Sequence, residues 1–458
     1  MAFTVRKKRI VVIVLVCVLI LGAAGGVIYG VIFAPLRSEG QAYTIPLIDL
    51  SESDGGVPPK LKYLYETVTV DDSADYLAHP DSIGLKNGNI LVLYPEGHGK
   101  GAIRNKISTD SGATYGSSLS ATPQSWEHSR ETPTVYRLNF TDREDMLIMI
   151  SANPRWFGES TTGGFNCSLS QDEGQNWTEF ELFYPKNQKN GVVPIVAMAS
   201  LTRLKENGKF ADKWMGLFHD ASFNNYKTIL TFDENGKMCW SVPEKYFVEH
   251  RVIERKTNMC EVEVIRSDGG NGDELCLITR SNTKKYNSLL SFSRDEGKSW
   301  TAPIETPAAL SGERHKAEYT ADGRLIITFR SVCRDKETLN KINKKYKKSG
   351  WYSEGAIAWV GTYEDLKMGR EGQYRIKLAH TYFDTQTTPQ TAAHHDTGYC
   401  GNTVLEDDSI IITIYGKFDP NKKAKDGSLK TYIVSKRLNL EDIDELYTFI
   451  LATKNSIK

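Results

Sequence analysis

Short apolar segments, broken by glycine, asparagine and aspartate, alternate along most of the chain. Several of them are rich in β-branched or aromatic residues and have the length of one strand: NILVLYP at 89–95, DMLIMISA at 145–152, ELCLITRS at 274–281, RLIITFRS at 324–331 and SIIITIYG at 409–416. Runs of this kind are typical of buried β-strands. A helical pattern competes only at 440–446, so the sequence predicts an all-β fold.

One apolar segment is far longer than the others. Residues 10–34 contain no charged side chain and follow a basic cluster, RKKR, at 6–9. A helix of this length, at about 1.5 Å per residue, crosses the roughly 30 Å hydrocarbon layer of a bilayer. A cleaved secretory signal peptide is the alternative, but its apolar region is shorter. We therefore expect an uncleaved anchor, with its basic end in the cytoplasm.

This orientation divides the chain into five parts. They are a cytoplasmic tail at 1–9, a transmembrane signal anchor at 10–34, a polar stalk at 35–60, a globular region at 61–450 and a C-terminal tail at 451–458. The predicted location is the cell membrane, crossed once by the N-terminal helix, with the globular region outside the cell.

The composition is that of a folded, turn-rich protein. Of the 458 residues, 40% are hydrophobic, 25% are charged and 37 are glycines, which excludes disordered and collagen-like classes. Basic and acidic residues are both 57, so the charge does not indicate a nucleic-acid partner. Cys17 lies in the predicted span, and the other cysteines, which lack metal-ligand spacing, are interpreted as small buried hydrophobic residues. We expect no metal and no cofactor.

A short motif recurs along the globular region at a nearly constant period. The pattern S-x-D-x-G-x-x-W, or its tyrosine variant, is present at 108–115, 170–177 and 293–300, with a degenerate copy around Asp233. The successive aspartates Asp110, Asp172, Asp233 and Asp295 are 62, 61 and 62 residues apart. A further-decayed site at 362–365 follows a charged insertion at 335–350.

The residue types of this box predict a structural role. The aspartate accepts backbone N–H bonds in a tight turn, the glycine takes a positive φ, and the aromatic ring packs the turn onto its own sheet. We therefore expect the boxes to hold β-hairpins and to carry no catalysis. A unit of about 62 residues has room for four strands, which is one blade of a β-propeller. The predicted fold is a six-bladed β-propeller over 61–450, preceded by a single N-terminal transmembrane helix.

With these boxes, the chain resembles the sialidase (neuraminidase) superfamily of six-bladed propellers over nearly the whole globular region. The resemblance implies an active site on the propeller axis. In that family, three arginines clamp the carboxylate of sialic acid, a tyrosine nucleophile is paired with a glutamate, and an aspartate is the acid/base. A tyrosine suits an anionic substrate because it brings less negative charge than a carboxylate nucleophile.

Segments of the fourth, fifth and sixth blades match parts of that site. The segment MCEVEVI at 259–265, followed by LCLITRS, nominates Glu261 as the partner base and Arg280 as one clamp residue. The segment DTGYCGN at 396–402 nominates Tyr399 as the nucleophile. Arg314, in GERHK at 312–316, is the expected second clamp residue, with Arg330 as the fallback.

The first blade departs from the family pattern. Where an Arg-Ile-Pro motif is expected the chain reads AHPDS at 78–82, and the late glutamate that orients its arginine is replaced by IYG at 414–416. The acid/base aspartate has no clear counterpart either. Glu96 and His98, in YPEGHGK, are the candidate substitutes, while Asp81, Glu96 and Glu131 form an alternative set of catalytic carboxylates.

Other polar residues fall where inner strands are expected to begin, and converging polar groups at one end of a propeller form a binding pocket. The predicted catalytic residues are Tyr399, Glu261, Glu96 and Asp81. The predicted substrate-binding residues are Arg280, Arg314, His315, Lys316, His79, His98, Glu131 and Asp396.

Three functions remain compatible with the sequence. The first is a sialidase or a relative that cleaves another acidic sugar, the second is a propeller glycosidase for a sugar without the carboxylate, and the third is a non-catalytic glycan-binding propeller. The set Tyr399, Glu261 and Arg280 favours an enzyme over a lectin. The sequence therefore predicts a membrane-anchored, extracellular, sialidase-like exo-glycosidase with a glycan substrate.

Overall fold

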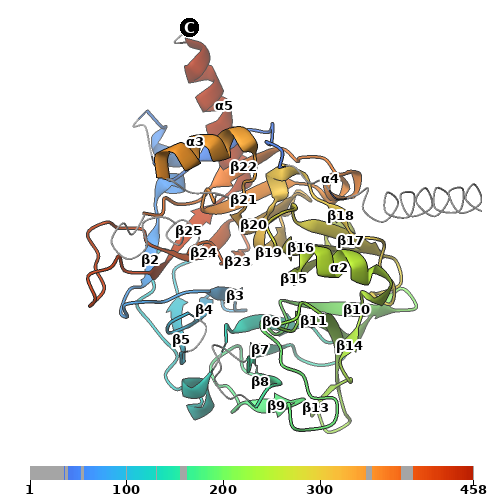
Figure 1. Cartoon of the computed structure of the whole chain (residues 1–458). Helices are drawn as coiled ribbons and strands as arrows, with labels where there is room; N and C mark the ends of the chain where they lie inside the picture. The colour runs from blue at the N-terminus through green and yellow to red at the C-terminus, as the bar shows by residue number, and fades with distance from the viewer. Residues whose placement is uncertain are drawn as a thin grey trace, which may run out of the picture.

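The strands of the chain form a ring of small sheets. The computed structural model describes residue 36 and residues 40–52, 56–98, 101–129, 131–154, 162–346, 353–382 and 396–456. Within these residues the strands form six sheets around a common centre (Figure 1). The predicted six-bladed β-propeller is therefore confirmed. The span predicted at 10–34 lies outside the described residues, among which no helix is long and apolar enough to cross a membrane.

The first three blades follow the chain in order, and each is antiparallel. Blade one contains β3 (Asp81–Gly84), β4 (Ile90–Pro95) and β5 (Ile103–Ser108). Blade two contains β6 (Thr134–Leu138), β7 (Met146–Ala152), β8 (Phe165–Ser170) and β9 (Glu181–Phe183). Blade three contains β10 (Ser200–Glu206), β11 (Lys209–His219), β12 (Asn225–Phe232), β13 (Met238–Trp240) and the short β14 (Glu244–Lys245).

Two of the last three blades, blades five and six, include a strand from the beginning of the described chain. Blade four contains β15 (Met259–Arg266), β16 (Leu275–Ser281), β17 (Leu289–Ser293) and β18 (Ile304–Glu305). Blade five contains β19 (Gly312–Tyr319), β20 (Leu325–Ser331), β21 (Ala356–Gly361), β22 (Tyr374–Lys377) and β1 (Leu47–Asp49). Blade six contains β23 (Cys400–Val404), β24 (Ile410–Gly416), β25 (Tyr432–Leu438) and β2 (Val68–Asp71).

The ring closes in blade six, where β2 pairs antiparallel with β25 from the other end of the chain. Blade five gains an outer strand in a similar way, because β1 pairs in parallel with β22. The segment expected to be a stalk up to residue 60 therefore contributes to the propeller. Ile48 and Leu50 are buried in the core at the outer edge of blade five, which is why this polar-looking segment folds onto it.

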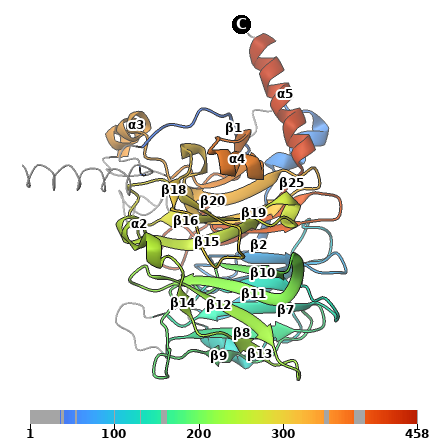
Figure 2. The same ribbon diagram turned by 90° about the vertical axis from the view of Figure 1, so that its right-hand side faces the viewer.

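The helices lie outside the six sheets. The α-helices are α2 (Arg251–Thr257), α3 (Lys336–Tyr346), α4 (Tyr363–Met368) and α5 (Leu440–Ser456). The 3-10 helices are η1 (Pro59–Tyr65), η2 (Gln124–His128), η3 (Val248–His250), η4 (Asp268–Gly270) and η5 (Ala308–Leu310). The first turns of α5 are anchored by buried Leu440, Ile443 and Leu446, and the helix then projects from the body (Figures 1 and 2).

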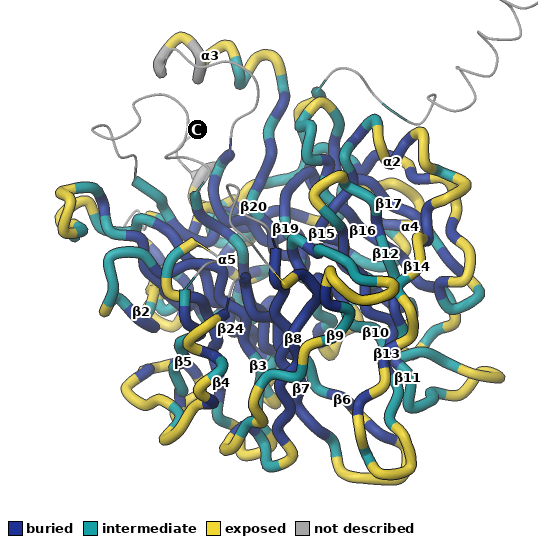
Figure 3. Tube along the Cα trace, turned by 60° about the horizontal axis from the view of Figure 1, so that its bottom comes forward, coloured by how far each residue is buried: buried dark blue, intermediate teal, exposed yellow. Residues whose placement is uncertain are grey.

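The core lies between neighbouring blades. Every residue of β4, β7 and β24 is buried, because blades on both sides cover these strands. Figure 3 shows the buried tube gathered around the centre and the exposed residues at the turns and rim. Four of the cysteines beyond the predicted span, Cys167, Cys260, Cys276 and Cys400, are buried as free thiols, and the described residues contain no disulfide.

The boxes form the turns that the sequence predicts. In the box of blade four, one carboxylate oxygen of Asp295 accepts hydrogen bonds from Ser293 Oγ at 2.8 Å and from the N–H of Ser299 at 2.9 Å. Gly297 has a φ of 73°, and Trp300 is buried. Blades one and two repeat these bonds around Asp110 and Asp172.

The site at 362–365 is not a box turn. Thr362 is the N-cap of α4, and its hydroxyl accepts from the N–H of Asp365 at 3.2 Å while the Asp365 carboxylate accepts from the N–H of Thr362 at 2.9 Å. This reciprocal capping box stabilises the start of a helix. The prediction of a decayed box at 362–365 is therefore wrong, because these polar residues form the start of α4.

The boxes lie on the face of the propeller away from the ends of the second strands. In blade four, β16 ends at Ser281, whereas β17 runs antiparallel to it and ends at Ser293, which is paired with Leu275 at the start of β16. The box follows β17 directly. Residues at the end of β16 and residues of the box are thus at opposite faces of the blade.

Asp295→Ala should lower the free energy of unfolding by about 1–3 kcal/mol, because the turn loses several hydrogen bonds. Asp233→Ala is the matched control. Among the described residues, the Asp233 carboxylate accepts from the N–H groups of Asn235 and Lys237 and from no side chain, so the loss of stability should be smaller. Denaturant titrations of both variants measure the difference. Abolished turnover with unchanged stability in Asp295→Ala would contradict the structural role.

Candidate active site on the propeller axis

The inner strands of blades four and five are distorted at equivalent places near the axis. The register of β15 against β16 shifts around Glu261, and that of β19 against β20 shifts around Arg314. Glu261 has a φ of 52° and Arg314 a φ of 55°, while His79, just before β3, has a φ of 48°. Bulges redirect side chains, and non-glycine residues at positive φ are concentrated at functional sites. These distortions direct side chains from three different blades toward one centre.

Three of the predicted residues meet at that centre. The Tyr399 hydroxyl donates to the Glu261 carboxylate, whose oxygens are 3.1 and 3.2 Å away. Nη1 of Arg280 donates to the same two oxygens at 2.9 and 3.0 Å and to the Tyr399 oxygen at 2.7 Å. The residues come from blades six and four, so the ring itself brings them together.

Glu313 is a functional residue that the sequence analysis missed. Its carboxylate, with a side chain only 1% exposed, pairs with Arg280 at 2.9 Å, Arg330 at 2.5 Å and Lys284 at 2.7 Å. Burial favours the protonated form, but these cations outweigh it and hold the pKa of Glu313 well below its ordinary value. Glu313 therefore stays ionised and fixes two arginines beside Tyr399.

Arg330, the fallback in the sequence analysis, is the second arginine at the tyrosine. Its Nη2 lies 3.5 Å from the Tyr399 oxygen, and its guanidinium lies 4.8 Å from the centre of the Tyr399 ring. Arg280 and Arg330 end β16 and β20 in the same way, since the strands read LITRS and ITFRS. That shared ending is the signal that identifies the pair.

Arg314 is also buried at the axis but is bound differently. Its Nη1 has no hydrogen-bond partner among the described residues. The nearby Glu261 and Tyr136 raise the pKa of Arg314, although burial opposes this, so its charge is retained. A buried guanidinium with a free N–H is suited to accept an anionic or polar group of a ligand.

The protonation states of the central pair suit nucleophilic attack. Burial raises the pKa of Tyr399 well above its ordinary value, although the positive charge of Arg280 opposes the shift. Burial also favours a protonated Glu261, but Arg280 and Arg314 outweigh it and keep the pKa of Glu261 below its ordinary value. Tyr399 therefore holds its proton in the free protein, and Glu261 is ionised and ready to accept it.

Uncharged rings occupy the first-blade side of the site. The His79 ring stacks on the Tyr399 ring at 4.8 Å and meets the Tyr415 ring edge-on at 5.0 Å. His98 lies 4.7 Å from His79 and is bonded to the Tyr76 hydroxyl at 2.8 Å. Burial lowers the pKa of both histidines, so both are neutral at pH 7.

The Tyr76 hydroxyl links this group to the sixth blade. It donates to Oδ1 of Asp396 at 2.8 Å. Asp396 therefore lies at the edge of the site, one hydrogen bond beyond the histidines, and does not contact Tyr399 in the described structure.

Glu131 is buried at the start of blade two, and only 3% of the residue is exposed. One carboxyl oxygen accepts from the N–H and hydroxyl of Thr132 at 2.7 and 2.8 Å, and the other has no hydrogen-bond partner among the described residues. Burial raises the pKa of Glu131 to about 8, although the bonds from Thr132 oppose the shift. Glu131 is therefore protonated at neutral pH.

Another predicted group lies between blades one, two and five. Asp81 accepts from the N–H of Val135 at 3.0 Å and faces the Lys316 amine at 3.4 Å, which in turn lies over the Tyr136 ring at 5.1 Å. His315 packs against Phe329 at 5.1 Å. Asp81 and Lys316 thus tie the inner strands of these three blades together, whereas His315 packs within blade five.

Glu96 is the predicted residue that the structure does not bring to the axis. Its side chain is 46% exposed and pairs with Arg104 at 2.9 Å. His219 is a residue the site adds, since it is buried near Glu261 and Arg280, and burial lowers its pKa to about 4. The described residues contain no cluster of histidine, cysteine and acidic side chains that could hold a metal ion.

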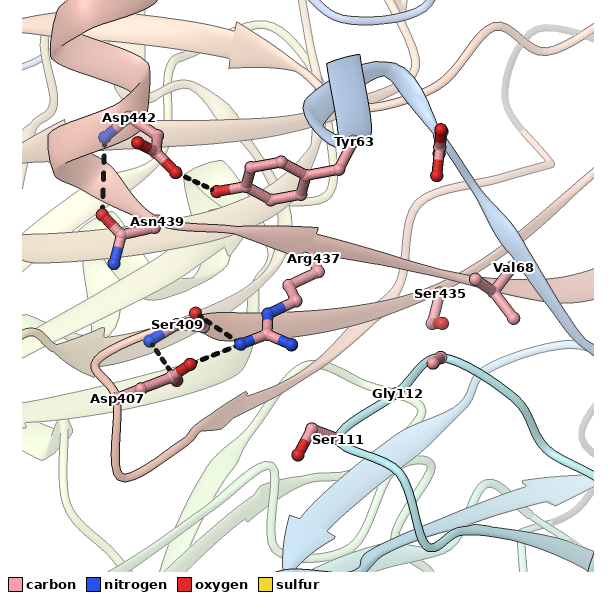
Figure 4. A pocket seen from close by; sticks show the side chains of 12 residues that line it. Tyr63, Val68, Ser111, Gly112, Asp407, Ser409, Ser435, Arg437, Asn439 and Asp442 are labelled. Carbon is pink, nitrogen blue, oxygen red and sulfur yellow. Dashed lines mark hydrogen bonds and ion pairs between the residues drawn. The ribbon is translucent and has the colours of Figure 1, made fainter. Parts of the chain in front are cut away.

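A separate pocket of about 530 Å³ lies at the seam between blade six and the box of blade one (Figure 4). In its lining Tyr63 donates to Asp442 at 2.5 Å, and Arg437 binds Asp407 and Ser409. None of the axial residues lines this pocket, and it adds no group to the site.

Comparison with known proteins supports the fold. Neither a protein-family model nor a curated protein matches the sequence. A protein of unknown function from Dyadobacter fermentans is similar in structure, with a TM-score of 0.52 and 15% identity over 82% of this chain and 98% of that chain. The NanB sialidase of Streptococcus pneumoniae has a TM-score of 0.48 and 11% identity over 82% and 70% of the two chains.

A Penicillium chrysogenum alpha-L-arabinanase has a TM-score of 0.37 and 11% identity over 82% and 98% of the chains. At these identities the similarity establishes the fold alone. The chain is a six-bladed β-propeller with Asp-box turns, and its axis carries a tyrosine–glutamate pair beside arginines.

Proposed function

We propose that the protein is an exo-glycosidase that removes a terminal acidic sugar, sialic acid or a related one, from glycans. The observation that carries the proposal is the contact of the Tyr399 hydroxyl with ionised Glu261 at 3.1 Å, held by Arg280. A nucleophile beside a base that a third group orients is the usual arrangement for covalent catalysis. A lectin needs no such pair.

The reaction on this site proceeds in two displacements. The Tyr399 oxygen attacks the anomeric carbon as its proton passes to Glu261, and the glycosidic bond breaks. Water then attacks the same carbon, the bond to Tyr399 breaks, and the tyrosine recovers its proton. Two inversions retain the configuration of the sugar.

The arginines favour an acidic substrate. Arg280 and Arg330 are already neutralised by Glu261 and Glu313, whereas Arg314 keeps a free buried N–H. A carboxylate of the sugar would supply the missing acceptor. A charge-assisted hydrogen bond of this kind is stronger than a neutral one.

One observation favours a second candidate, a propeller glycosidase that acts on a neutral sugar. The segment AHPDS at 78–82, where the resemblance expects an arginine, has none, and its His79 is neutral and stacks on the Tyr399 ring. A sugar without a carboxylate needs fewer cations around it. The two candidates share the Tyr399 chemistry and differ only in the substrate.

We also propose that the propeller is held at the outer surface of the cell membrane by residues 10–34. The support is the uncharged length of this segment and the preceding RKKR, a combination that orients single-pass anchors. An extracellular glycosidase so placed would act on glycans outside the cell.

Tyr399→Phe should keep binding and lose turnover by orders of magnitude, because only the attacking oxygen is removed. Glu261→Gln should do the same, since an amide does not accept the proton. The double variant should lose little more than either single one, because the two residues act as one unit. Kinetics with 4-methylumbelliferyl α-sialoside and neutral aryl glycosides measure this. Full turnover in Tyr399→Phe would refute the mechanism.

Arg314→Met should raise KM for an acidic aryl glycoside about 10- to 100-fold, the value of a lost charge-assisted hydrogen bond. The matched control is Arg294→Met, since Arg294 is exposed in the box of blade four on the opposite face. KM for both variants is compared on acidic and neutral substrates. Equal KM increases on both substrates would favour the neutral-sugar candidate.

Protease added to intact cells should release a fragment that begins after residue 34 and before β1, because β1 is paired with β22 in blade five. The control is protease added to lysed cells, in which every exposed cleavage site is accessible. N-terminal sequencing of the released fragment makes the measurement. A protected propeller, or a mature N-terminus near residue 26 in the medium, would contradict the proposed anchor.

A further inference from the structure

The proposed reaction requires a group that gives a proton to the departing oxygen, and the first blade does not supply the aspartate expected there. We propose that Glu131, from blade two, is this general acid and, in the second step, the general base. The inference rests on the proposed function and gives Glu131 a role beside Tyr399, whereas the sequence analysis placed it among the substrate-binding residues and in an alternative set of catalytic carboxylates.

The hydrogen bonds of Glu131 distinguish its two oxygens. Oε1 accepts twice, from the N–H and the hydroxyl of Thr132. Oε2 is buried and has no partner among the described residues. The proton of a neutral carboxyl therefore lies on Oε2, which is the oxygen free to donate it. An unpaired buried polar atom otherwise costs stability, and a bound substrate oxygen would satisfy it.

The surroundings fix this carboxyl close to the reacting pair. Oε1 of Glu131 accepts from the Thr132 hydroxyl at 2.8 Å, that hydroxyl contacts Nδ1 of His79 at 3.0 Å, and the His79 ring stacks on the Tyr399 ring at 4.8 Å. The backbone oxygen of Glu131 is held by the hydroxyls of Ser129 at 3.1 Å and Ser151 at 2.9 Å. The side chain is thus positioned from a rigid segment.

Other titratable groups near Tyr399 fit the role less well. Both oxygens of Asp81 are used, by backbone N–H groups and the Lys316 amine. Burial lowers the pKa of His79 and of His219, so neither carries the extra proton at neutral pH. Glu96 is exposed and paired with Arg104.

The proton balance of both steps closes with Glu131. In the first step Oε2–H gives its proton to the leaving oxygen as the glycosidic bond breaks, and Tyr399 gives its own proton to Glu261. In the second step the ionised Glu131 takes a proton from the attacking water, and Tyr399 recovers its proton from Glu261. The hydroxyl of Thr132 also contacts Nδ1 of His79 at 3.0 Å, so it bridges Glu131 to the ring stacked on Tyr399.

The test compares leaving groups. Glu131→Gln should lower kcat/KM on 3′-sialyllactose, whose leaving group needs a proton, by about 10²- to 10⁴-fold. On 4-nitrophenyl α-sialoside, whose leaving group departs as an anion, the loss should be below about 10-fold by the same reasoning. Azide should restore turnover of the nitrophenyl substrate by Glu131→Ala, giving a glycosyl azide.

The pH profile gives a second readout. Glu131 must be protonated for the first step, so wild-type kcat/KM should fall as pH rises above about 8, the pKa of its carboxyl. Glu131→Gln should lose this basic limb. The matched control is Glu254→Gln, because Glu254 is a buried glutamate that binds Asn225 away from the axis. It should lower the melting temperature without any dependence on the leaving group.

The outcomes separate the inference from the proposed function. If Glu131→Gln loses the same factor on both sialosides, or keeps the basic limb, Glu131 is not the acid while the glycosidase stands. If Glu96→Gln shows the leaving-group pattern instead, Glu96 is the acid and the inference is overturned. If the wild-type protein hydrolyses no acidic or neutral glycoside, the proposed function fails and the inference fails with it.

Discussion

The pairing of β2 with β25 is the interaction on which the axial site depends. It joins the two ends of the ring in blade six, and Tyr399 immediately precedes β23, the innermost strand of that blade. Glu261 belongs to blade four, so the two residues meet only when the other blades and the closure of the ring fix the distance across the axis. Gly401 contributes at the seam, since a side chain there would lie 2.5 Å from the backbone nitrogen of Ser82 in blade one.

Closure alone would bury several charges at an unfavourable cost. The site avoids this cost because the buried charges form specific ion pairs with one another. Glu313 neutralises Arg330 and shares Arg280 with Glu261, while Lys284 completes the shell around Glu313. With Glu313 ionised, Arg280 remains beside Glu261 and Tyr399. Glu313 thus determines the position of the residues around Tyr399 without a hydrogen bond of its own to the tyrosine oxygen in the described structure.

Local patterns in the sequence were sufficient for the fold and for part of the site. The boxes around Asp110, Asp172 and Asp295 depend on bonds within a few residues, so their period revealed the blades. Glu261 and Tyr399 were found through resemblance, and the contact between them follows from the ring. Glu313 was not found, because only the register of β19 against β20 shows that it faces Arg330.

Glu96 illustrates the opposite error. Glu96 directly follows β4 in blade one, where the resemblance expects the acid/base residue. Its side chain nevertheless turns outwards and binds Arg104 on β5. Spacing along a sequence does not determine which way a residue after a strand points. The same limit applies to β1. It lies in a polar segment, and its role as a strand follows only from its pairing with β22.

The departure in the first blade has a coherent physical explanation. A sialidase-like arginine there needs a late glutamate beside it, because a buried cation without a partner is strongly unfavourable. The structure places residues of the two segments, 78–82 and 414–416, side by side, since the rings of His79 and Tyr415 are 5.0 Å apart. Replacing only one member would leave a buried charge unpaired, whereas replacing both with uncharged rings does not. The remaining cations then come from blades four and five, so the site carries its positive charges on one side and presents a neutral aromatic wall on the other.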